Sequence, residues 1–382
     1  MKYRLLGNTG LRVSEVALGC EGAINAPFEL VKEITEAAIA GGMNFLDIFC
    51  AEPDVRDAFG QLLHPYRDNF MIQGHLGACW ENGQYLRSRE EKHVVPAFED
   101  LLRRLKRDYL DVGMIHYVDT DSDLDEIMNG WFITYMQELK QKGLIRHIGM
   151  SSHNPEVALR AVKTGLLEVL LFSVNPCYDL QPPREEFDEV WKPENYTDPL
   201  KNIDPVREEL YTTCEANGVG IVVMKAFGGG DLLDAEWSPF RIAMKPEHCL
   251  HYALTRPAAA SVVGGYRSAS EAHAAARYSD LSDEERDYAP FLANVPTHSF
   301  MGKCIYCGHC APCTVGINIA QVNKFHDLTR NKDTVPPSVK DHYRLLSHHA
   351  GECIACGQCE VNCPFGVEII NKMKEAEQVF GY

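Results

Sequence analysis

The stretch NFLDIFCAEPDVRDAFG, residues 44–60, contains one complete unit of strand, loop and helix. Its first residues are mostly apolar, and the strand is expected to end at Asp47. A short helix is then expected to begin near Asp54. Polar side chains in such a loop are often functional, because a rigid scaffold holds them in place. Similar units recur along the chain, so their number and order decide the fold.

Eight short apolar runs predict strands, because each is too short for a helix and is β-branched or bounded by turn residues. They are EVALGC (15–20), NFLDIF (44–49), NFMIQGH (69–75), DVGMIHYV (111–118), HIGMSSH (147–153), EVLLFSVNP (168–176), GIVVMKAF (220–227) and ASVVGG (260–265). Helix-like segments separate them, among them FELVKEITEAAIAGG (28–42), LDEIMNGWFITYMQELKQKG (124–143) and PVREELYTTCEANG (205–218).

Eight alternating β-α units predict a (β/α)8 TIM barrel, an α/β fold with its active site at the carboxyl ends of the strands. A doubly wound open sheet is the structural alternative. It is disfavoured because no G-x-G-x-x-G run follows the first strand.

The length of 382 residues exceeds what one compact core usually serves. We therefore expect a barrel over residues 1–292 and a smaller domain over residues 293–382. A soluble, cytoplasmic protein is expected, since no apolar run is long enough to span a membrane and MKYRLLGNTGLRVSEVALG (1–19) lacks the core of a secretory signal. The net charge of -17 would repel phosphate backbones, so nucleic-acid binding is not expected.

Eight of the 14 cysteines lie in two runs near the carboxyl terminus, CIYCGHCAPC (304–313) and CIACGQCEVNCP (353–364). The second matches the bacterial ferredoxin pattern C-x2-C-x2-C-x3-C-P. The first has one residue fewer before its fourth cysteine and Thr314 in place of proline. Zinc and disulfides are disfavoured, because zinc motifs usually pair two C-x-x-C units and cytoplasmic disulfides are uncommon.

In such runs three thiolates bind one [4Fe-4S] cluster and the fourth normally reaches the other cluster. We therefore predict two ligand sets. The first set is Cys304, Cys307, Cys310 and Cys363, and the second set is Cys353, Cys356, Cys359 and Cys313. Since four cysteines fill each set, neither cluster is expected to bind substrate, and both are expected to carry electrons.

Six other cysteines are scattered through the first 250 residues, and most are expected to be small core residues. They are Cys20, Cys50, Cys79, Cys177, Cys214 and Cys249. Three of them, Cys20, Cys50 and Cys177, are distinguished by their positions along predicted strands.

Four segments in order, MKYRLLGNTGLRVSEVALG (1–19), GLIRHIGMSSHNPE (143–156), GIVVMKAFGGG (220–230) and SVVGGYRS (261–268), resemble the aldo-keto reductase superfamily. When the two cysteine runs are considered as well, the chain is similar to the branch of this superfamily that carries a C-terminal ferredoxin-type domain. The resemblance covers essentially the whole chain. It implies a TIM barrel, a two-cluster lobe and an oxidoreductase activity.

The resemblance also implies a catalytic tetrad of Asp, Tyr, Lys and His at strand ends. The aspartate corresponds to Asp47 and the histidine to His116. Glu52 occupies the tyrosine position and His75 the lysine position, while Tyr66 lies too far along the chain to replace the tyrosine. Two members, the proton donor and the residue that lowers its pKa, are therefore changed.

Binding of NADP(H) is a further implication, and its positions are matched only in part. Val174 stands where the family has an aromatic residue, Leu171 where it has glutamine, and Ala274 and Ala275 where it has acidic and amide residues. The positions that could still bind the cofactor are Ser151, Ser152, Asn175, Lys225, Gly228, Gly229 and Arg267.

Asp47, His75 and His116 come from three adjacent strand ends, so we expect their side chains to converge at the barrel mouth. One interpretation is acid-base chemistry, with Glu52 or His75 protonating a carbonyl oxygen. A second is a divalent metal held by the two histidines and the carboxylate. A third is that these residues are hydrogen-bonded remnants of the family site.

Two long loops, 177–202 and 228–247, are candidate covers of the mouth. Trp191, Tyr196 and Trp237 in these loops could stack on a ring-shaped substrate or could simply pack on the barrel. Glu21 and His153 are expected to face the mouth as wall residues.

These features predict an iron-sulfur oxidoreductase that acts on a small polar, sugar-like carbonyl or hydroxy compound, with a redox protein as a further partner. Nicotinamides transfer hydride whereas clusters transfer single electrons, so direct coupling would need a converter such as a flavin, for which no motif is visible. Two alternatives stay open. One is a metal-dependent lyase, isomerase or hydrolase, and the other is an electron-transfer or regulatory subunit.

Overall fold

The computed structural model of the protein describes residues 1–183, 202–293, 295, 300–329 and 334–382. Eight parallel strands form a closed barrel in the order β3-β4-β5-β8-β9-β10-β11-β12, with β12 pairing back to β3. Their bounds are Val16–Gly19, Phe45–Ile48, Met71–Leu76, Leu110–Ile115, Ile145–Ser152, Val169–Ser173, Gly220–Met224 and Ala259–Gly264. Each predicted run contains one of these strands, so the TIM barrel is confirmed and the open sheet is excluded.

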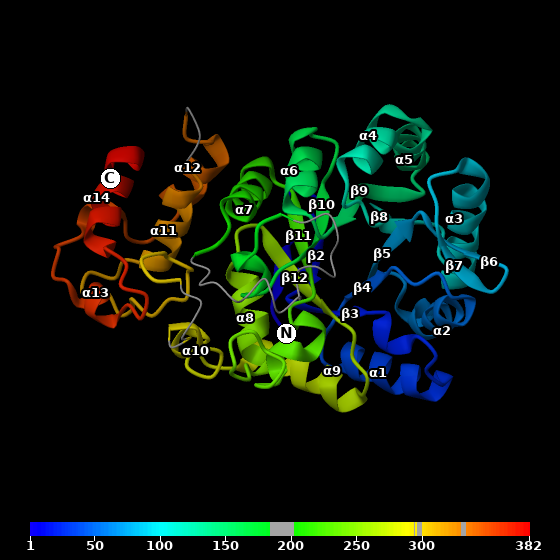
Figure 1. Ribbon diagram of the computed structural model, residues 1–382, viewed down its shortest axis with the longest axis horizontal. Helices are drawn as coiled ribbons and strands as arrows, with labels where there is room; N and C mark the ends of the chain where they lie inside the picture. Colours follow the sequence, from blue (N-terminus) through cyan, green and yellow to red (C-terminus); the bar gives the residue numbers. More distant parts are fainter. Residues whose placement is uncertain (184–201, 294, 296–299, 330–333) are drawn as a thin grey trace.

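Nine helices in the described part of the chain cover the barrel (Figure 1). They are α1 Phe28–Ala40, α2 Pro53–Leu63, α3 Glu91–Leu105, α4 Asp121–Asn129, α5 Trp131–Gln141, α6 Pro155–Lys163, α7 Pro205–Asn217, α8 Pro246–Thr255 and α9 Ala269–Ala276. Proline opens four of them, at a position where its missing N–H costs nothing. Within these described residues, no helix combines the length and the apolar character that a membrane span needs.

The segment 124–143, which the sequence pattern presented as one helical stretch, is divided between α4 and α5 at Gly130. Gly130 has an extended backbone conformation, with φ of -106° and ψ of -170°. A Cβ atom at this position would lie 2.4 Å from the carbonyl oxygen of Glu126. The close approach requires glycine, and it lets α5 leave in a new direction.

The amino-terminal end of the barrel is closed by a hairpin of β1 Tyr3–Leu5 and β2 Arg12–Ser14. Ten buried apolar side chains form a core that extends from this hairpin into the barrel. They are Leu6, Val13, Ala17, Phe45, Val112, Met114, Val169, Leu171, Val222 and Ala260. Because side chains fill this end, the opposite end, where the strands terminate, is the open mouth.

A second hairpin follows β5 directly and was not expected from the sequence. It consists of β6 Ala78–Glu81 and β7 Gln84–Arg87, with Trp80 paired to Tyr85. The two residues between the strands, Asn82 and Gly83, have φ angles of 51° and 77°. Positive φ at both positions is the requirement of a two-residue type I′ turn, which Asn-Gly favours.

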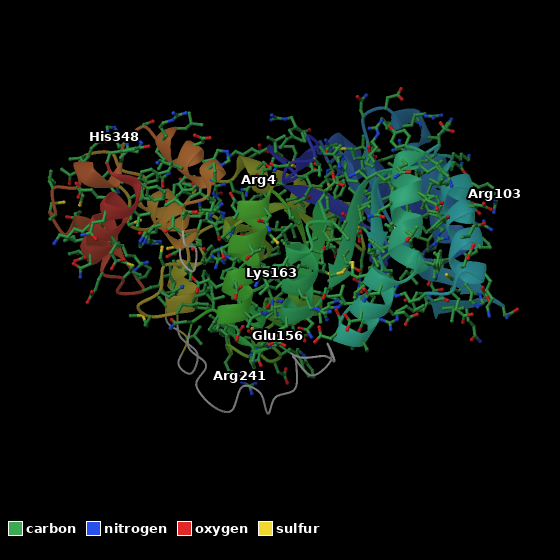
Figure 2. All side chains as sticks on the ribbon, turned by 90° about the horizontal axis from the view of Figure 1, so that it is seen from above. Arg4, Arg103, Glu156, Lys163, Arg241 and His348 are labelled. Carbon is green, nitrogen blue, oxygen red and sulfur yellow. The ribbon has the colours of Figure 1, made fainter. Side chains whose placement is uncertain are left out.

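The carboxyl-terminal lobe follows α10 Ala289–Ala293 and contains α11 Ile319–Asp327, α12 Pro337–Arg344, α13 Gln358–Asn362 and α14 Ile369–Phe380. The terminal helix α14 packs within this lobe, against α11. Figure 1 shows the lobe on the flank of the barrel beside α7 and α8. In Figure 2 the labelled His348 of the lobe and Arg103 of α3 mark opposite ends of the molecule.

Buried hydrogen bonds join the lobe to this flank. The backbone carbonyl of Ile305 accepts hydrogen bonds from the Arg256 guanidinium and, at 2.9 Å, from the Tyr288 hydroxyl. Lys303 forms an ion pair with Glu208 of α7. Since Ile305 lies between Cys304 and Cys307, the barrel directly supports the first cysteine run.

Candidate active site

A cavity of about 580 Å³ opens at the carboxyl ends of the barrel strands. Its walls include six of the predicted site residues, namely Asp47, Glu52, His75, His116, Ser151 and Lys225. Glu21 and His153 also line it, as expected for wall residues. The parallel strands bring these side chains together because all of them end at the same rim.

Four side chains form a continuous hydrogen-bonded chain in this cavity, which we call the relay. Asp47 Oδ1 lies 3.0 Å from His75 Nε2, and His75 Nδ1 lies 2.8 Å from His116 Nδ1. His116 Nε2 lies 2.8 Å from the hydroxyl oxygen of Tyr85. At the far end, Gln73 Nε2 also donates to Asp47 Oδ1, at 2.7 Å.

The relay has one proton arrangement that satisfies every contact with neutral rings. Tyr85 donates its O–H to His116 Nε2, so the His116 proton must reside on Nδ1. His116 Nδ1–H then donates to His75 Nδ1, and His75 Nε2–H donates to the Asp47 carboxylate. All donors therefore point away from the cavity and toward Asp47.

The electrostatics of the site favour this neutral arrangement. Burial lowers the pKa of His116 well below its ordinary value of 6.5, and neighbouring His75 lowers it further. Burial also raises the pKa of Tyr85 above its ordinary value of 10.0. At neutral pH His116 is therefore an uncharged acceptor and Tyr85 a protonated donor, which is the state that the relay requires.

The lowered pKa of His116 predicts that the free energy of unfolding falls as the pH drops below 6.5. In that range the unfolded chain protonates this histidine while the folded chain resists, so acid favours unfolding. Thermal unfolding of the intact protein between pH 8 and pH 5.5 measures the effect. The variant His116→Gln should show a shallower decline, and an equal decline in both proteins would contradict the assignment.

Tyr85 was missed by sequence reasoning, which searched only the loop after Asp47 for a tyrosine. The available signal was the Asn82-Gly83 pair, a strong marker of a two-residue hairpin. That hairpin folds back from β5 and carries Tyr85 to the rim, where the residue is 49% exposed. Gln73 was also missed, although a polar residue inside a buried strand is itself a signal.

The structure changes the roles considered for Glu52 and His75. Both ring nitrogens of His75 are engaged in the relay, and the residue is 2% exposed, so it is not positioned to protonate a substrate. Glu52 lines the cavity just before α2, but among the described residues no hydrogen bond joins its carboxylate to the relay. All four members line the cavity, and Tyr85 is by far the most exposed of them.

The geometry does not favour the extra metal ion considered for Asp47, His75 and His116. Among the described residues at the mouth, no group of three His, Asp or Glu side chains is arranged to hold a single metal ion. The two histidines use their facing Nδ1 atoms to bond each other. In the neutral arrangement His116 Nδ1 carries a proton and the His75 Nδ1 lone pair accepts it, so neither atom is available to an ion.

Some predicted nicotinamide ligands are committed to the protein itself. Ser152 is buried and donates to Asp119, and Asn175 is buried with its amide bonded to the backbone at Lys225, Cys177 and Tyr178. Neither side chain is free to hold a carboxamide. In the cavity wall, Ser151 accepts a hydrogen bond from the backbone N–H of Tyr117.

The phosphate-binding positions fit a nucleotide better. Gly228 and Gly229 open the 3-10 helix η6 Gly228–Leu233, and a Cβ atom added to Gly229 would meet nothing within 4 Å. Lys225 lies in the cavity wall, and the side chain of Arg267 is exposed. An open glycine loop that closely follows a lysine in sequence suits a phosphate group. The positions predicted for the phosphate groups are thus open, whereas two of those predicted for the nicotinamide are already engaged.

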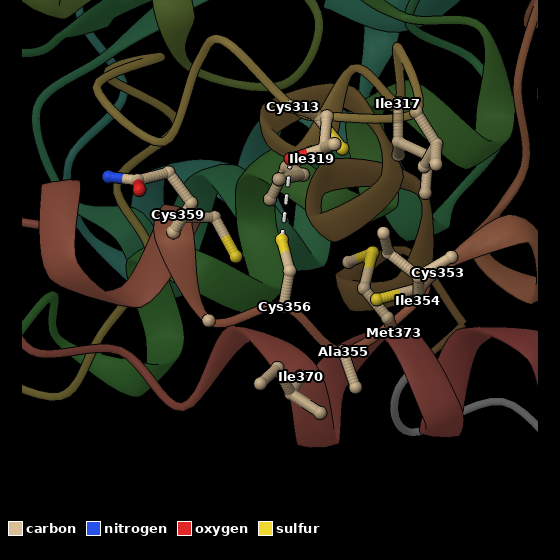
Figure 3. A pocket seen from close by; sticks show the side chains of 14 residues that line it. Cys313, Ile317, Ile319, Cys353, Ile354, Ala355, Cys356, Cys359, Ile370 and Met373 are labelled. Atoms are coloured by element: carbon tan, nitrogen blue, oxygen red, sulfur yellow. Dashed lines mark hydrogen bonds between the residues drawn. The ribbon is translucent and has the colours of Figure 1, made fainter.

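The predicted cluster cysteines come together as two sets. Cys313 lines one pocket with Cys353, Cys356 and Cys359, as Figure 3 shows. The other four line a second pocket, namely Cys304, Cys307, Cys310 and Cys363. Each pocket thus combines three thiols of one run with the fourth of the other, the arrangement that two [4Fe-4S] clusters need. Polar donors lie beside the sulfurs, since Asn323 Nδ2 is 3.4 Å from Cys304 Sγ and Thr314 Oγ1 is 3.4 Å from Cys356 Sγ.

The two candidate cover loops are described only in part. Trp191 and Tyr196 lie outside the described residues. Trp237 is described and is 68% exposed, so it does not pack on the barrel. Its stacking on a substrate stays a prediction.

A closed barrel with a hydrogen-bonded relay at its mouth and two four-cysteine sites in an attached lobe defines an iron-sulfur oxidoreductase of the TIM-barrel class. The chain belongs to the Aldo/keto reductase family, whose model matches residues 18–244. A 4Fe-4S dicluster domain matches residues 300–367. The predicted boundary between residues 292 and 293 falls between these two ranges.

Known proteins similar to this chain support the same family. The uncharacterized oxidoreductase YqkF of Bacillus subtilis is 27% identical over 279 residues, which are 69% of this chain and 87% of YqkF. The L-glyceraldehyde 3-phosphate reductase of Escherichia coli K12 is 26% identical over 174 residues, 43% of this chain and 49% of that enzyme. A solved aldo-keto reductase from Bacillus halodurans, in its holo form, has a TM-score of 0.58 at 24% identity and covers 75% of this chain and 94% of its own. That structural likeness shows the fold.

Proposed function

We propose that this protein interconverts a small polar hydroxy compound and its carbonyl, and that Tyr85 exchanges the proton on the substrate oxygen. The observation that carries the proposal is the relay, which begins at Asp47 and ends at a half-exposed Tyr85 hydroxyl in the mouth cavity. A hydroxyl in this position is a general acid for a carbonyl and, in reverse, a general base for an alcohol.

The proton arrangement of the relay suits alcohol oxidation. The substrate hydroxyl gives its proton to Tyr85 while Tyr85 passes its own to His116 Nε2. His116 then releases its Nδ1 proton to His75, and His75 releases its Nε2 proton to Asp47. One proton has then moved from substrate to Asp47, and carbonyl reduction runs the same steps backward. When bound, NADP+ would supply the hydride acceptor for the carbinol carbon, and Lys225, Gly229 and Arg267 would hold its phosphate side.

The cavity supports a small, polar substrate. Its volume of about 580 Å³ is in the range of small-molecule sites. Charged or ionisable side chains in its wall, among them Glu21, Glu52 and Lys225, offer partners for several hydroxyl groups. Two relatives, an L-glyceraldehyde 3-phosphate reductase and an L-galactose dehydrogenase, are named for sugar substrates. We therefore propose a sugar or sugar-derived alcohol.

The lobe supplies a route for single electrons that most simple reductases lack. Two clusters together hold two electrons, the number released when one alcohol is oxidised. Because bound NADP+ would take both electrons as one hydride, we propose that a separate flavin-containing redox protein accepts the pair from NADPH and passes the electrons singly to the lobe.

Anaerobically purified protein, with its clusters intact, tests the proposal. We expect NADP+-dependent oxidation of a sugar or small polyol, and loss of this turnover in a variant with both His75→Ala and His116→Ala. The matched control is His273→Ala, an exposed histidine on α9 away from the mouth. An active double variant would favour the electron-transfer subunit instead. Calorimetric titration with NADP+ separately tests the cofactor, because both variants should bind it equally.

A further inference from the structure

We propose that Cys20 and Cys50 form a dithiol-disulfide couple at the barrel mouth that exchanges an electron pair with small disulfides and dithiols. This site is distinct from the cluster cysteines of the lobe. It also does not depend on the identity of the substrate proposed above.

The barrel geometry brings the two cysteines together. Cys20 directly follows β3, and Cys50 follows the neighbouring strand β4 by two residues. In this parallel pair Gly19 lies opposite Asp47, so both cysteines emerge at the same part of the rim. The two sulfur atoms lie 2.7 Å apart, and the Cys50 N–H donates to Cys20 Sγ at 3.3 Å. A disulfide bond of about 2.0 Å could therefore form with only a small movement.

Both side chains of the pair are buried, and they lie where the barrel core meets the wall of the mouth cavity. Cys20, Cys50 and Glu52 all line that cavity. Cys79 provides a contrast, because its thiol points to the carbonyl oxygen of His93, at 3.6 Å. Cys214 is buried on α7, on the outside of the barrel. The Cys20–Cys50 pair is thus both preassembled and beside the space that a small molecule enters.

The surroundings favour the reduced form at neutral pH and slow its reaction. Hydrogen bonding to Cys20 raises the pKa of Cys50, and burial and the nearby carboxylates of Glu52 and Asp47 raise it further. The thiolate is the form that attacks a disulfide. Exchange should therefore accelerate as the pH rises from 7 to 9.

The electron balance of the reaction is simple. The two thiols lose two protons and two electrons and form one S–S bond. A small disulfide takes up both and leaves as two thiols. The new bond would tie the start of the 3-10 helix η1 Glu21–Ala23 to the loop that carries Glu52. Oxidation would thus fix the wall of the cavity beside the relay.

Equilibration with 2-hydroxyethyl disulfide and 2-mercaptoethanol tests the couple in the anaerobic holoprotein. After acid quenching and alkylation, peptide mass spectrometry should find the Cys20 and Cys50 peptides joined, two hydrogens lighter than the free pair. The joined fraction should follow the disulfide-to-thiol ratio, and it should form faster at pH 9 than at pH 7. Alkylation of both cysteines at every ratio at pH 9 would overturn the proposal.

Single variants complete the test. Cys20→Ser and Cys50→Ser should each eliminate the joined peptide and leave the remaining cysteine of the pair alkylated or bound to 2-mercaptoethanol. The matched control Cys79→Ser should leave the Cys20–Cys50 product unchanged. A joined product of Cys50 with any cysteine other than Cys20 in the parent protein would also refute the assignment, whatever the variants do.

Discussion

Replacement of Tyr85 by phenylalanine should lower kcat by about 10²- to 10⁴-fold, the usual contribution of a general acid or base. The substitution keeps the ring and removes only the hydroxyl that bonds His116 Nε2 at 2.8 Å. Because the proton moves only in the reaction, the variant loses an interaction that is made in the transition state, so KM should change little. Steady-state kinetics in the oxidation and reduction directions measures both constants.

Two companion variants make this result specific to Tyr85. Tyr66→Phe is the matched control, since Tyr66 is 44% exposed and lies outside the cavity wall. Glu52→Gln distinguishes the alternative in which the carboxylate at the family's tyrosine position is the acid. If Glu52→Gln lost activity to this extent and Tyr85→Phe stayed within tenfold of the parent, the proton donor would be Glu52.

The convergence of Asp47, His75 and His116 could be predicted because parallel strands end at one rim. Tyr85 could not be placed in the same way. Its hairpin leaves the barrel after β5 and returns to the rim, so its position depends on tertiary packing rather than on strand order. The residue that completes the relay thus comes from a hairpin between β5 and α3. Matching positions with the family pattern examined only the loop after Asp47.

The nicotinamide positions show a second limit of sequence reasoning. A match of positions locates a residue at a strand end but does not reveal its hydrogen-bond partners. Ser152 and Asn175 occupy plausible positions, yet Asp119 and the backbone at Lys225 already engage them. Gly130 shows the same limit. The helical sequence pattern continues through it, but one close backbone contact, which the pattern does not reveal, divides the helix.

The cysteine sets could be predicted because spacing alone limits which thiolates reach one cluster. A variant with both Cys307→Ala and Cys363→Ala should therefore lose one cluster and keep the other. Both cysteines line the same pocket, and two remaining thiolates do not hold a cubane. Iron and sulfide analysis should fall from about eight to about four of each per chain. Electron paramagnetic resonance of the reduced variant should show a single cluster without a magnetic neighbour.

The split pair, Cys356→Ala with Cys363→Ala, is the decisive comparison. These two cysteines lie in the same sequence run but line different pockets, so their removal should damage both clusters. We expect no complete four-iron cluster in this variant. If each run instead bound its own cluster, the split pair would keep one intact cluster and the first pair would keep none. The two variants remove the same number of thiolates, so a general loss of stability should affect both equally. A difference in their cluster content therefore shows which pocket each fourth cysteine serves.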